Sequence, residues 1–240
     1  AQAEVLLQEG ADIIDIGGES TFIDRKEVSA EEELRRVLPV IKHIKTQHTS
    51  VAISIDTYKA EVAEKAIAVG ATIVNDVTAG RGDQRMFSVA AELGVPIILM
   101  YAKDDSSRTT TTPQEYEDVV ATVTAFLANR IAEAKKTGVT DEQIIVDPGL
   151  GFFVSGIAKY SYKILAHLDK ITALGYPVLV SPSRKSFLAG QEQLAPAERL
   201  PGTIAASAIA ALNGAHIIRT HDVAEVRRGC EVAKYISYAR

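Results

Sequence analysis

Residues 53–57 read Ile-Ser-Ile-Asp-Thr, and this stretch decides the fold class because an apolar, β-branched run ends there in a carboxylate. Similar endings recur along the chain, in IDIGGEST at 14–21, IVNDV at 73–77, VDPG at 146–149 and RTHD at 219–222. Longer segments of helical period separate these runs. This alternation predicts repeated βα units and a parallel sheet with polar groups at the carboxyl ends of its strands.

Seven strands and eight helices are predicted from this pattern. The strands are expected at Asp12–Gly17, Val51–Asp56, Thr72–Val77, Pro96–Tyr101, Gln143–Asp147, Pro177–Ser181 and His216–Thr220. The helices are expected at Ala1–Glu9, Ala30–His48, Ala60–Val69, Asp83–Leu93, Pro113–Lys136, Ser161–Leu174, Leu200–Leu212 and Val223–Tyr238. Ser29 before three glutamates is a helix start signal.

Strands this apolar are covered on both faces, in an open doubly wound sheet or a closed (β/α)8 barrel. No strand leads into a G-x-G-x-x-G turn, and nearly every strand ends in polar residues. Both observations favour an α/β fold of the (β/α)8 TIM-barrel type with its site at the carboxyl rim. We expect one domain over residues 1–240, with the first strand of the barrel missing before Ala1.

The composition excludes several function classes. The chain has 240 residues, is 47% hydrophobic and carries a formal net charge of −5, without a basic run, so nucleic acid is not an expected partner. Its apolar stretches are too short to cross a bilayer. The single cysteine, Cys230, allows no internal disulfide and fits a reducing, cytoplasmic setting.

Two strand ends offer groups that could hold a polar ring. Asp56 ends a strand and is expected to face the barrel mouth, although Asp is also a common helix cap. Asn75 and Asp76 point to opposite faces of their strand, so only one can face a pocket. An Asn side chain offers both a donor and an acceptor to a heterocycle edge, while turn formation is the alternative explanation.

Three later motifs add charge. Asp147 ends a strand before an irregular Pro-Gly loop, and residues 183–186 (Ser-Arg-Lys-Ser) stand between a strand and a helix, where cations and N–H groups can collect an anion. Arg219 and His221 share one face of the last strand. With Lys185, these groups predict a pocket for a flat polar ring and a phosphate, and a pyrophosphate leaving group normally needs Mg²⁺.

The segment after the first strand completes the predicted rim. Gly17 and Gly18 let backbone N–H groups approach a ligand closely, and polar residues follow. These rim residues are Asp15, Glu19, Ser20 and Thr21. The low-complexity patch at Ser106–Thr112 is expected to be a mobile rim loop.

Nearly the whole chain resembles the dihydropteroate synthase family, in family order. The motifs that carry the resemblance are GADIIDIGGEST at 10–21, EEELRRVLPVI at 31–41, ISIDTYKAEVAEKA at 53–66, IVNDVTAG at 73–80, DPGLGF at 147–152, SRKSFL at 183–188 and RTHDV at 219–223. The resemblance implies an eight-stranded barrel that joins 4-aminobenzoate to the hydroxymethyl carbon of a dihydropterin pyrophosphate and releases pyrophosphate with the help of Mg²⁺.

The resemblance also implies roles for individual residues. Those implied for the pterin are Asp56, Asn75, Asp147, Phe152 and Lys185, with Asp56, Asp147 and Lys185 catalytic. Those implied for the pyrophosphate are Arg219, His221 and Thr21. Those implied near the aminobenzoate are Ser186, Arg25, Phe22 and Phe153. A homodimer is implied, with the apolar stretch Ile204–Leu212 as a candidate face, although this is also an ordinary core stripe.

The chain departs from the family pattern in three places. The family's first strand, with an Asn associated with the metal and pyrophosphate, has no counterpart before Ala1. After GGEST the usual Arg-Pro is replaced by Phe22-Ile23-Asp24-Arg25. After DPGLG the segment GFFVSGIAKYSYKIL is about two residues longer than usual and resembles the sulfonamide-insensitive Sul-type synthases. Phe153 is therefore expected to help exclude sulfonamides, with neutral loop drift as the alternative.

Two other functions compete with this interpretation. A pterin-dependent methyltransferase shares the barrel and the pterin-binding carboxylate and Asn, but SRKSF and RTHDV would have no anion to bind there. A catalytically inactive pterin-binding paralogue would explain the altered loop residues.

Overall fold

The computed structural model describes residues 2–21 and 26–239. These residues form two compact units. The first comprises Ala1–Thr109 and Asn129–Ile145, and the second comprises Thr110–Ala128 and Val146–Arg240. Each unit alternates strands with helices, as the sequence pattern predicts.

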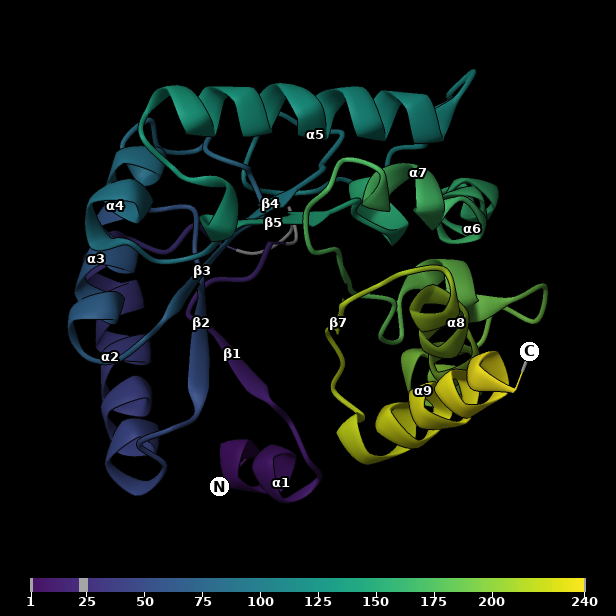
Figure 1. Ribbon diagram of the computed structural model, residues 1–240, viewed down its shortest axis with the longest axis horizontal. Coiled ribbons are helices and arrows are strands. Elements are labelled where there is room, and N and C mark those ends of the chain that lie inside the picture. Colours follow the sequence, from purple (N-terminus) through teal and green to yellow (C-terminus); the bar gives the residue numbers. More distant parts are fainter. Residues whose placement is uncertain (1, 22–25, 240) are drawn as a thin grey trace. The chain divides into compact units, whose positions relative to one another are not determined.

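The first unit is built on parallel strands β1 to β4 and the start of β5 (Figure 1). Its helices are α1 (Gln2–Gln8), α2 (Ala30–Gln47), α3 (Ala60–Ala68) and α4 (Met86–Leu93), followed by the 3-10 turn η1 (Asp141–Gln143). Its strands are β1 (Ile13–Gly17), β2 (Ala52–Asp56), β3 (Ile73–Asp76), β4 (Ile97–Met100) and β5 (Ile144–Asp147), hydrogen-bonded in that order. The register aligns Gly17 with Asp56 and Asp56 with Asn75.

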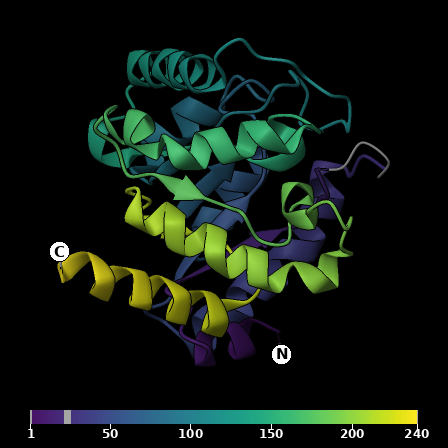
Figure 2. The same ribbon diagram turned by 90° about the vertical axis from the view of Figure 1, so that its right-hand side faces the viewer.

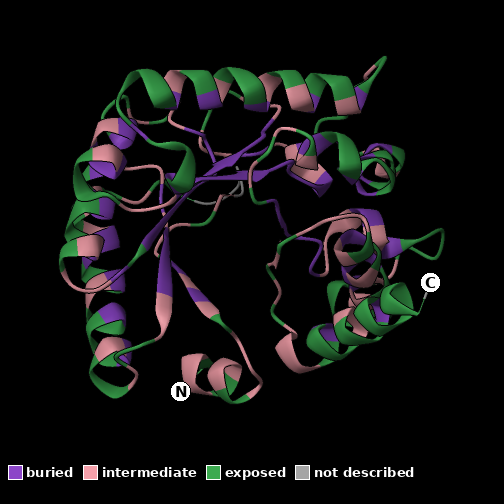
Figure 3. Ribbon diagram, viewed as in Figure 1, coloured by how far each residue is buried: buried purple, intermediate pink, exposed green. Residues whose placement is uncertain are grey.

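The core of this unit lies between the sheet and helices α2, α3 and α4, whose buried residues face the strands (Figure 3). Its largest fully buried side chains include Ile41, Ile53, Ile55, Met86 and Leu99. Burying an aliphatic side chain of this size contributes about 1.5–3 kcal/mol, so the sheet that carries the strand-end groups is well supported.

The second unit contains the pair of parallel strands β6 (Leu179–Val180) and β7 (Ile217–Ile218). Its helices are the first part of α5 (Val119–Lys136), α6 (Ala158–Ala166), α7 (Leu168–Thr172), α8 (Leu200–Leu212) and α9 (Val223–Tyr238). Three 3-10 turns are η2 (Gly151–Phe153), η3 (Ser186–Ala189) and η4 (Pro196–Arg199). Helices α8 and α9 pack side by side, as Figure 2 shows.

The predicted elements are largely confirmed. All seven strands occur in order, although β6 and β7 are only two residues long. Helices α8 and α9 have the predicted bounds, and Ser29 caps α2, since its Oγ accepts a hydrogen bond from Glu32 N at 3.2 Å. The predicted parallel α/β arrangement is therefore correct.

Three helix predictions are wrong in detail. The helix predicted from Pro113 begins at Val119, because Asp118 Oδ1 accepts the N–H groups of Val120 and Ala121 and caps it there. Helix α4 begins at Met86 rather than Asp83. The helix predicted over Ser161–Leu174 is two helices that meet at His167. Asn213 Nδ2 donates to Leu165 O at 2.8 Å, which satisfies a carbonyl near this break.

Candidate active site

Polar side chains of the first unit meet across β1, β2 and β3. Asn75 is 5% exposed, and its Nδ2 lies 3.4 Å from both carboxylate oxygens of Asp15. Ser54 Oγ donates to Asp15 Oδ1, and Asp56 is the register partner of Asn75. Two of the predicted pterin-binding residues, Asp56 and Asn75, thus lie on adjacent strands, with Asp15 holding the amide of Asn75.

Asp76 serves the turn that follows β3. It is fully buried, and it accepts hydrogen bonds from Thr78 N at 2.8 Å, Thr78 Oγ1 at 2.7 Å and Gly80 N at 2.6 Å. Burial raises the pKa of Asp76, and these hydrogen bonds act in the opposite direction. Asn75 is therefore the residue of the pair that remains available as a ligand group.

The loop after β1 is held close to α2 and to the loop after β4. A Cβ on Gly18 would come within 2.8 Å of Glu33 Cγ, so the close approach of α2 requires glycine there. Thr21 O accepts a hydrogen bond from Thr109 N at 2.9 Å. The predicted aminobenzoate residues Phe22 and Arg25 lie outside the described residues.

In the second unit, Asp147 and Lys185 influence one another's charge. Asp147 is 4% exposed and accepts a hydrogen bond from Gly149 N at 2.7 Å. Burial raises the pKa of Asp147, against the opposing effect of the positive charges of Lys185 and Arg219. Burial also lowers the pKa of Lys185 to about 8, although Asp147 acts to raise it. Both groups thus have protonation equilibria unlike those of surface residues, as is common at active sites.

The loop after β5 wraps around Lys185. Lys185 Nζ donates to Leu150 O at 3.1 Å and lies 5.0 Å from the centroid of the Phe153 ring. Gly151 has a φ of 64° and would place a Cβ 3.3 Å from Lys185 Cδ, so a larger residue would be strained there. The predicted residues Phe152 and Phe153 both belong to η2, beside Gly151.

The SRKS and RTHD motifs are joined by hydrogen bonds. Ser183 Oγ lies 3.0 Å from His221 Nδ1 and accepts from His221 N at 3.2 Å. Arg184 donates to both carboxylate oxygens of Asp222, at 2.9 and 2.6 Å, from a left-handed backbone with a φ of 51°. This bidentate ion pair ties the loop after β6 to the loop after β7. Ser186 starts η3 in the first of these loops.

Arg219 places a positive charge among these groups. Burial has the larger effect on Asp147, Lys185 and His221 alike; the charge of Arg219 opposes the raised pKa of Asp147 and adds to the lowered pKa values of Lys185 and His221. The second unit therefore brings together four of the predicted residues, Asp147, Lys185, Arg219 and His221. Their charges suit a ligand that combines a polar ring with an anion.

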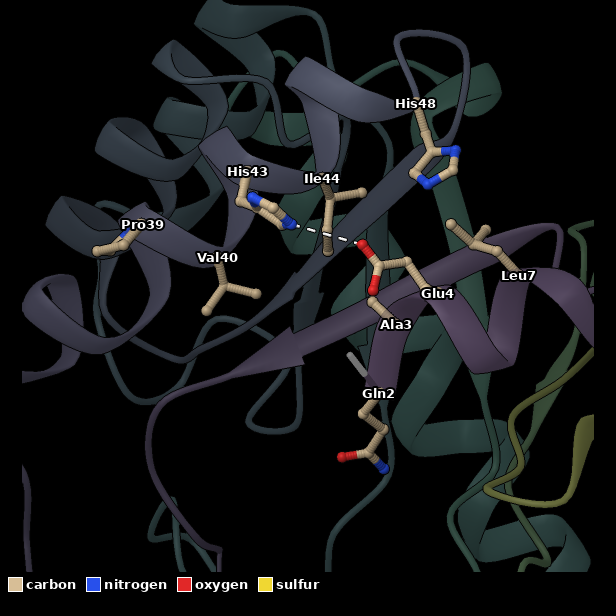
Figure 4. A pocket seen from close by; sticks show the side chains of 9 residues that line it. All are labelled: Gln2, Ala3, Glu4, Leu7, Pro39, Val40, His43, Ile44 and His48. Carbon is tan, nitrogen blue, oxygen red and sulfur yellow. Dashed lines mark ion pairs between the residues drawn. The ribbon is translucent and has the colours of Figure 1, made fainter.

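A separate apolar groove of about 350 Å³ lies between α1 and α2 (Figure 4). It is lined by Leu7, Val40 and Ile44 among others, and His43 Nε2 and Glu4 Oε1 lie 3.5 Å apart beside it. None of the predicted site residues lines this groove. It also adjoins the end of α2 that leads into the amino end of β2, so it is not the candidate active site.

Ser54 is a site residue that the sequence prediction missed. Strict alternation places Ser54 and Asp56 on one face of β2 and Ile53 and Ile55 on the other, so the signal was present in ISID. The contact of Ser54 with Asp15 depends on the register of β1 against β2, which the sequence does not specify.

A parallel α/β fold whose strands end in carboxylate, amide and cationic groups defines the class of α/β enzymes that have their site at the carboxyl ends of the strands. The sequence profile described as "Pterin binding enzyme" matches residues 1–221. Dihydropteroate synthase of Escherichia coli K12 is 39% identical over 232 residues, which cover 97% of this chain and 80% of that protein. Dihydropteroate synthase of Bacillus subtilis is 41% identical, with 94% of this chain and 75% of that protein covered.

Solved structures agree with these relatives. Dihydropteroate synthase from Xanthomonas albilineans in complex with 7,8-dihydropteroate has a TM-score of 0.87 and 38% identity, covering 98% of this chain and 85% of that one. The Yersinia pestis synthase in a sulfonamide drug complex has a TM-score of 0.90 and 34% identity, covering 100% of this chain and 85% of that one. The chain belongs to the dihydropteroate synthase family of pterin-binding enzymes, and the predicted TIM-barrel class is confirmed.

Within the described part of the chain, no helix is long and apolar enough to span a membrane.

Proposed function

We propose that this enzyme condenses 6-hydroxymethyl-7,8-dihydropterin pyrophosphate with 4-aminobenzoate, giving 7,8-dihydropteroate and pyrophosphate for folate biosynthesis. Its membership of the family supports this proposal, and the observation that carries it is the grouping of Asp147, Lys185, Arg219 and His221. The X. albilineans synthase has been solved with 4-aminobenzoic acid and with 7,8-dihydropteroate, which are the expected second substrate and product.

We assign the predicted residues to three parts of the reaction. Asp56, Asn75, Asp147, Phe152 and Lys185 are assigned to the pterin, and Arg219, His221 and Thr21 to the pyrophosphate. Ser186, Arg25, Phe22 and Phe153 are assigned to the aminobenzoate. Departure of pyrophosphate breaks the C–O bond and leaves a delocalised cation on the pterin methylene, which nearby carboxylates stabilise. The amine then forms the C–N bond and releases a proton.

The test combines binding with turnover. Calorimetry should show binding of the pterin pyrophosphate, and 4-aminobenzoate should then cause pyrophosphate release with formation of dihydropteroate. Binding without release would favour an inactive paralogue. Methyl transfer to a corrinoid protein, without pyrophosphate release, would favour a methyltransferase.

Mg²⁺ is proposed to reach the enzyme with the pyrophosphate. The described residues contain no group of three or more His, Cys, Asp or Glu side chains placed to hold a metal ion. Mg²⁺ commonly keeps several waters and binds through substrate phosphates and one or two carboxylates, so it would supply charge neutralisation to the leaving group. Chelation should abolish pyrophosphate release, and added Mg²⁺ should restore it; full activity in chelator would contradict the proposal.

Sulfonamide insensitivity of the Sul type is proposed to depend on Phe153. The loop that carries Phe153 is well anchored, since Tyr116 OH donates to Val154 O at 2.7 Å and Ser155 Oγ donates to Gln114 O at 2.8 Å. A phenyl ring on an anchored loop keeps its position and can narrow the aminobenzoate pocket, whereas a ring on a mobile loop would move aside when an inhibitor binds. Replacing Phe153 and Val154 with alanine should increase sulfonamide inhibition at least tenfold, with a smaller change in KM for 4-aminobenzoate. A sulfonamide-sensitive parent would contradict the proposal.

A homodimer through α8 and α9 is proposed because both helices expose apolar side chains. Ile209 and Leu212 on α8 are 49% and 43% exposed, and Val232, Ile236 and Tyr235 on α9 are 52–73% exposed. Large exposed apolar groups on neighbouring helices are typical of interfaces. Sedimentation should show a dimer for the parent and a monomer for Val232→Glu, whereas a monomeric parent would contradict the proposal.

The chain is also proposed to act as one pterin-binding domain in the cytoplasm. The family profile runs through both compact units, and the single cysteine fits a reducing compartment. Cooperative unfolding of both units in one calorimetric transition, and cofractionation with cytoplasmic markers, are the expected results.

A further inference from the structure

The side chain of Ser183 makes three polar contacts with the loop after β7. Its Oγ accepts a hydrogen bond from His221 N at 3.2 Å, and it lies 3.4 Å from Thr220 Oγ1 and 3.0 Å from His221 Nδ1. Ser183 is 8% exposed, so these contacts are made away from bulk water. Ser183, in the loop after β6, is thus bonded to both the backbone and the ring of one histidine.

The directions of these hydrogen bonds follow from what a hydroxyl group can do. A serine hydroxyl has one proton to donate and two lone pairs that accept. Thr220 Oγ1 accepts from Asp222 N at 3.0 Å, so it can donate its own proton to Ser183 Oγ. The N–H of His221 is the second donor to Ser183 Oγ. Both lone pairs of Ser183 are then occupied, and its proton is left for His221 Nδ1.

This contact determines which nitrogen of the His221 ring carries a proton. An imidazole nitrogen that accepts a hydrogen bond is unprotonated, so a neutral ring bonded to Ser183 through Nδ1 is the Nε2–H tautomer. Within the described part of the chain the ring makes no other hydrogen bond, and His221 keeps part of its surface exposed. The Nε2–H group therefore remains available to a ligand.

The surroundings of His221 favour its neutral form. Partial burial is the largest cause of a pKa below the ordinary value of 6.5, and the charge of Arg219 adds to it. Asp222 acts to raise this pKa and Arg184 to lower it, and these two residues form an ion pair 2.6 Å apart. At neutral pH the ring is therefore mainly uncharged, and the position of its single proton decides what it can bind.

We propose that Ser183 is a positioning residue that fixes His221 as the neutral Nε2–H tautomer, so that the ring donates a hydrogen bond to a pyrophosphate oxygen. This inference rests on the proposed function, in which Arg219 and His221 bind the pyrophosphate. The opposite tautomer would present a lone pair at Nε2, and a lone pair repels the oxygen of an anion. Ser183 thereby determines whether His221 attracts or repels the anion.

The tautomer can be measured directly by NMR of the uniformly ¹⁵N-labelled protein at neutral pH. Ring nitrogens with and without a proton resonate far apart, and the signals that disappear in His221→Gln identify the ring. We expect a proton on Nε2 and none on Nδ1. His216 is an internal reference, because its Nδ1 accepts a hydrogen bond from Val178 N at 3.1 Å and is unprotonated for the same reason. A proton on Nδ1 of His221 would overturn the inference.

Pyrophosphate binding tests the role of Ser183. In calorimetry with inorganic pyrophosphate and Mg²⁺ at neutral pH, Ser183→Ala should weaken binding about tenfold, and its NMR signals should become those of a tautomer mixture. Ser183→Thr keeps the hydroxyl and should restore most of the affinity. Ser207→Ala is the matched control and should bind like the parent, because Ser207 Oγ is buried without a hydrogen-bond partner in the described structure. Unchanged affinity in Ser183→Ala would overturn the inference.

The pH dependence separates an effect on the tautomer from a general loosening of the loop. Below the pKa of His221, which the NMR titration gives, both ring nitrogens carry protons and the tautomer no longer matters. The difference in pyrophosphate affinity between the parent and Ser183→Ala should therefore shrink to about twofold at low pH. A difference that stays about tenfold at every pH would show a purely structural role and overturn the inference. A parent that has the expected tautomer but binds no pyrophosphate would instead contradict the proposed function.

Discussion

Lys59 and Lys185 both follow a strand end, yet their surroundings have opposite effects on their charge. Lys59 contacts two carboxylates, and these hydrogen bonds outweigh burial and raise its pKa. Lys185 has Leu150 O as its hydrogen-bond acceptor and shares its surroundings with Asp147 and Arg219, so burial lowers its pKa to about 8. Lys59 is paired with two carboxylates of the protein, whereas Lys185 has a backbone carbonyl as its hydrogen-bond acceptor.

The difference fits the proposed assignment, in which Lys185 binds the substrate and Lys59 has a structural role. A cation whose partners are built into the chain adds specificity to the fold, while a cation kept in an unfavourable environment gains from binding an anion or a polar ring. The sequence motifs ISIDTYK and SPSRKS do not reveal this difference, because each places a lysine shortly after an apolar run.

The largest expected effect is on activity, when Lys185 is replaced by methionine. Loss of the ammonium should lower kcat/KM for the pterin pyrophosphate about 1,000-fold, or ~4 kcal/mol. The thermal unfolding temperature should stay the same or rise, because a partly buried charge is removed. Lys163→Met on exposed α6 surface is the control and should keep parental activity. A Lys185→Met variant with parental activity would show that Lys185 has no greater role in the reaction than Lys59.

Replacing Lys59 with methionine should act mainly on stability. Glu19 and Glu33 would lose a shared cation, which should lower the free energy of unfolding by about 3 kcal/mol in urea denaturation. Lys65→Met is the matched control, since Lys65 and Glu61 form a surface pair with 52% and 51% side-chain exposure. That control should change stability by less than about 0.5 kcal/mol. Equal losses in the two variants would show that the buried group of charges around Lys59 has no special role.

The pH dependence of stability should have opposite signs at the two lysines. Between the lowered pKa of folded Lys185, about 8, and the ordinary value of 10.5, the unfolded chain binds more protons. The parent should therefore gain stability relative to Lys185→Met as pH rises through this window, by about 2 kcal/mol after allowing for solvent contact. The raised pKa of Lys59 predicts the reverse: its contribution persists up to pH 10.5 and is lost above it. Urea curves at pH 8 and 10.5 would test the prediction for Lys185, and curves at pH 10.5 and at a higher pH would test the prediction for Lys59.

The smallest expected effect comes from the Phe153 ring over Lys185. A cation–π contact stabilises the charged form of the lysine by about 0.5–1 kcal/mol. Phe153→Leu should therefore shift the alkaline limb of the pH profile of kcat/KM to lower pH, by ~0.5 pH unit. The parental limb should lie near pH 8, where Lys185 loses its proton. A pH–rate profile with the same limb in both enzymes would show that the ring does not affect the lysine.

Local sequence signals predicted the strands and most helices, because hydrophobic periodicity, helix-capping residues and helix-breaking residues act over only a few residues. The break at His167 was missed since no glycine or proline marks it, and the supporting hydrogen bond comes from Asn213, far along the chain. The late start of α5 likewise depends on residues 114–116 bonding to the loop after β5.

The same limit applies to the candidate site. Strand-end position led to the prediction of Asp56, Asn75, Asp147 and Lys185, because parallel strands present their carboxyl ends on one side, and their substrate contacts stay a prediction. The partners of Glu19 could not be predicted, since Arg108 is 89 residues away in sequence and stands in a serine- and threonine-rich patch. Contacts of this kind depend on tertiary structure alone.

The ion pair between Arg184 and Asp222 has a consequence for how tightly an anion can bind. The loops after β6 and β7 are joined to each other by this pair and by the hydrogen bonds between Ser183 and His221, all of them contacts within the protein. An arriving pyrophosphate would not have to freeze two independent segments, and the conformational entropy lost on binding would be correspondingly small. Most of the free energy of its contacts with the protein would then contribute to affinity, because little of it would be needed to order the two loops.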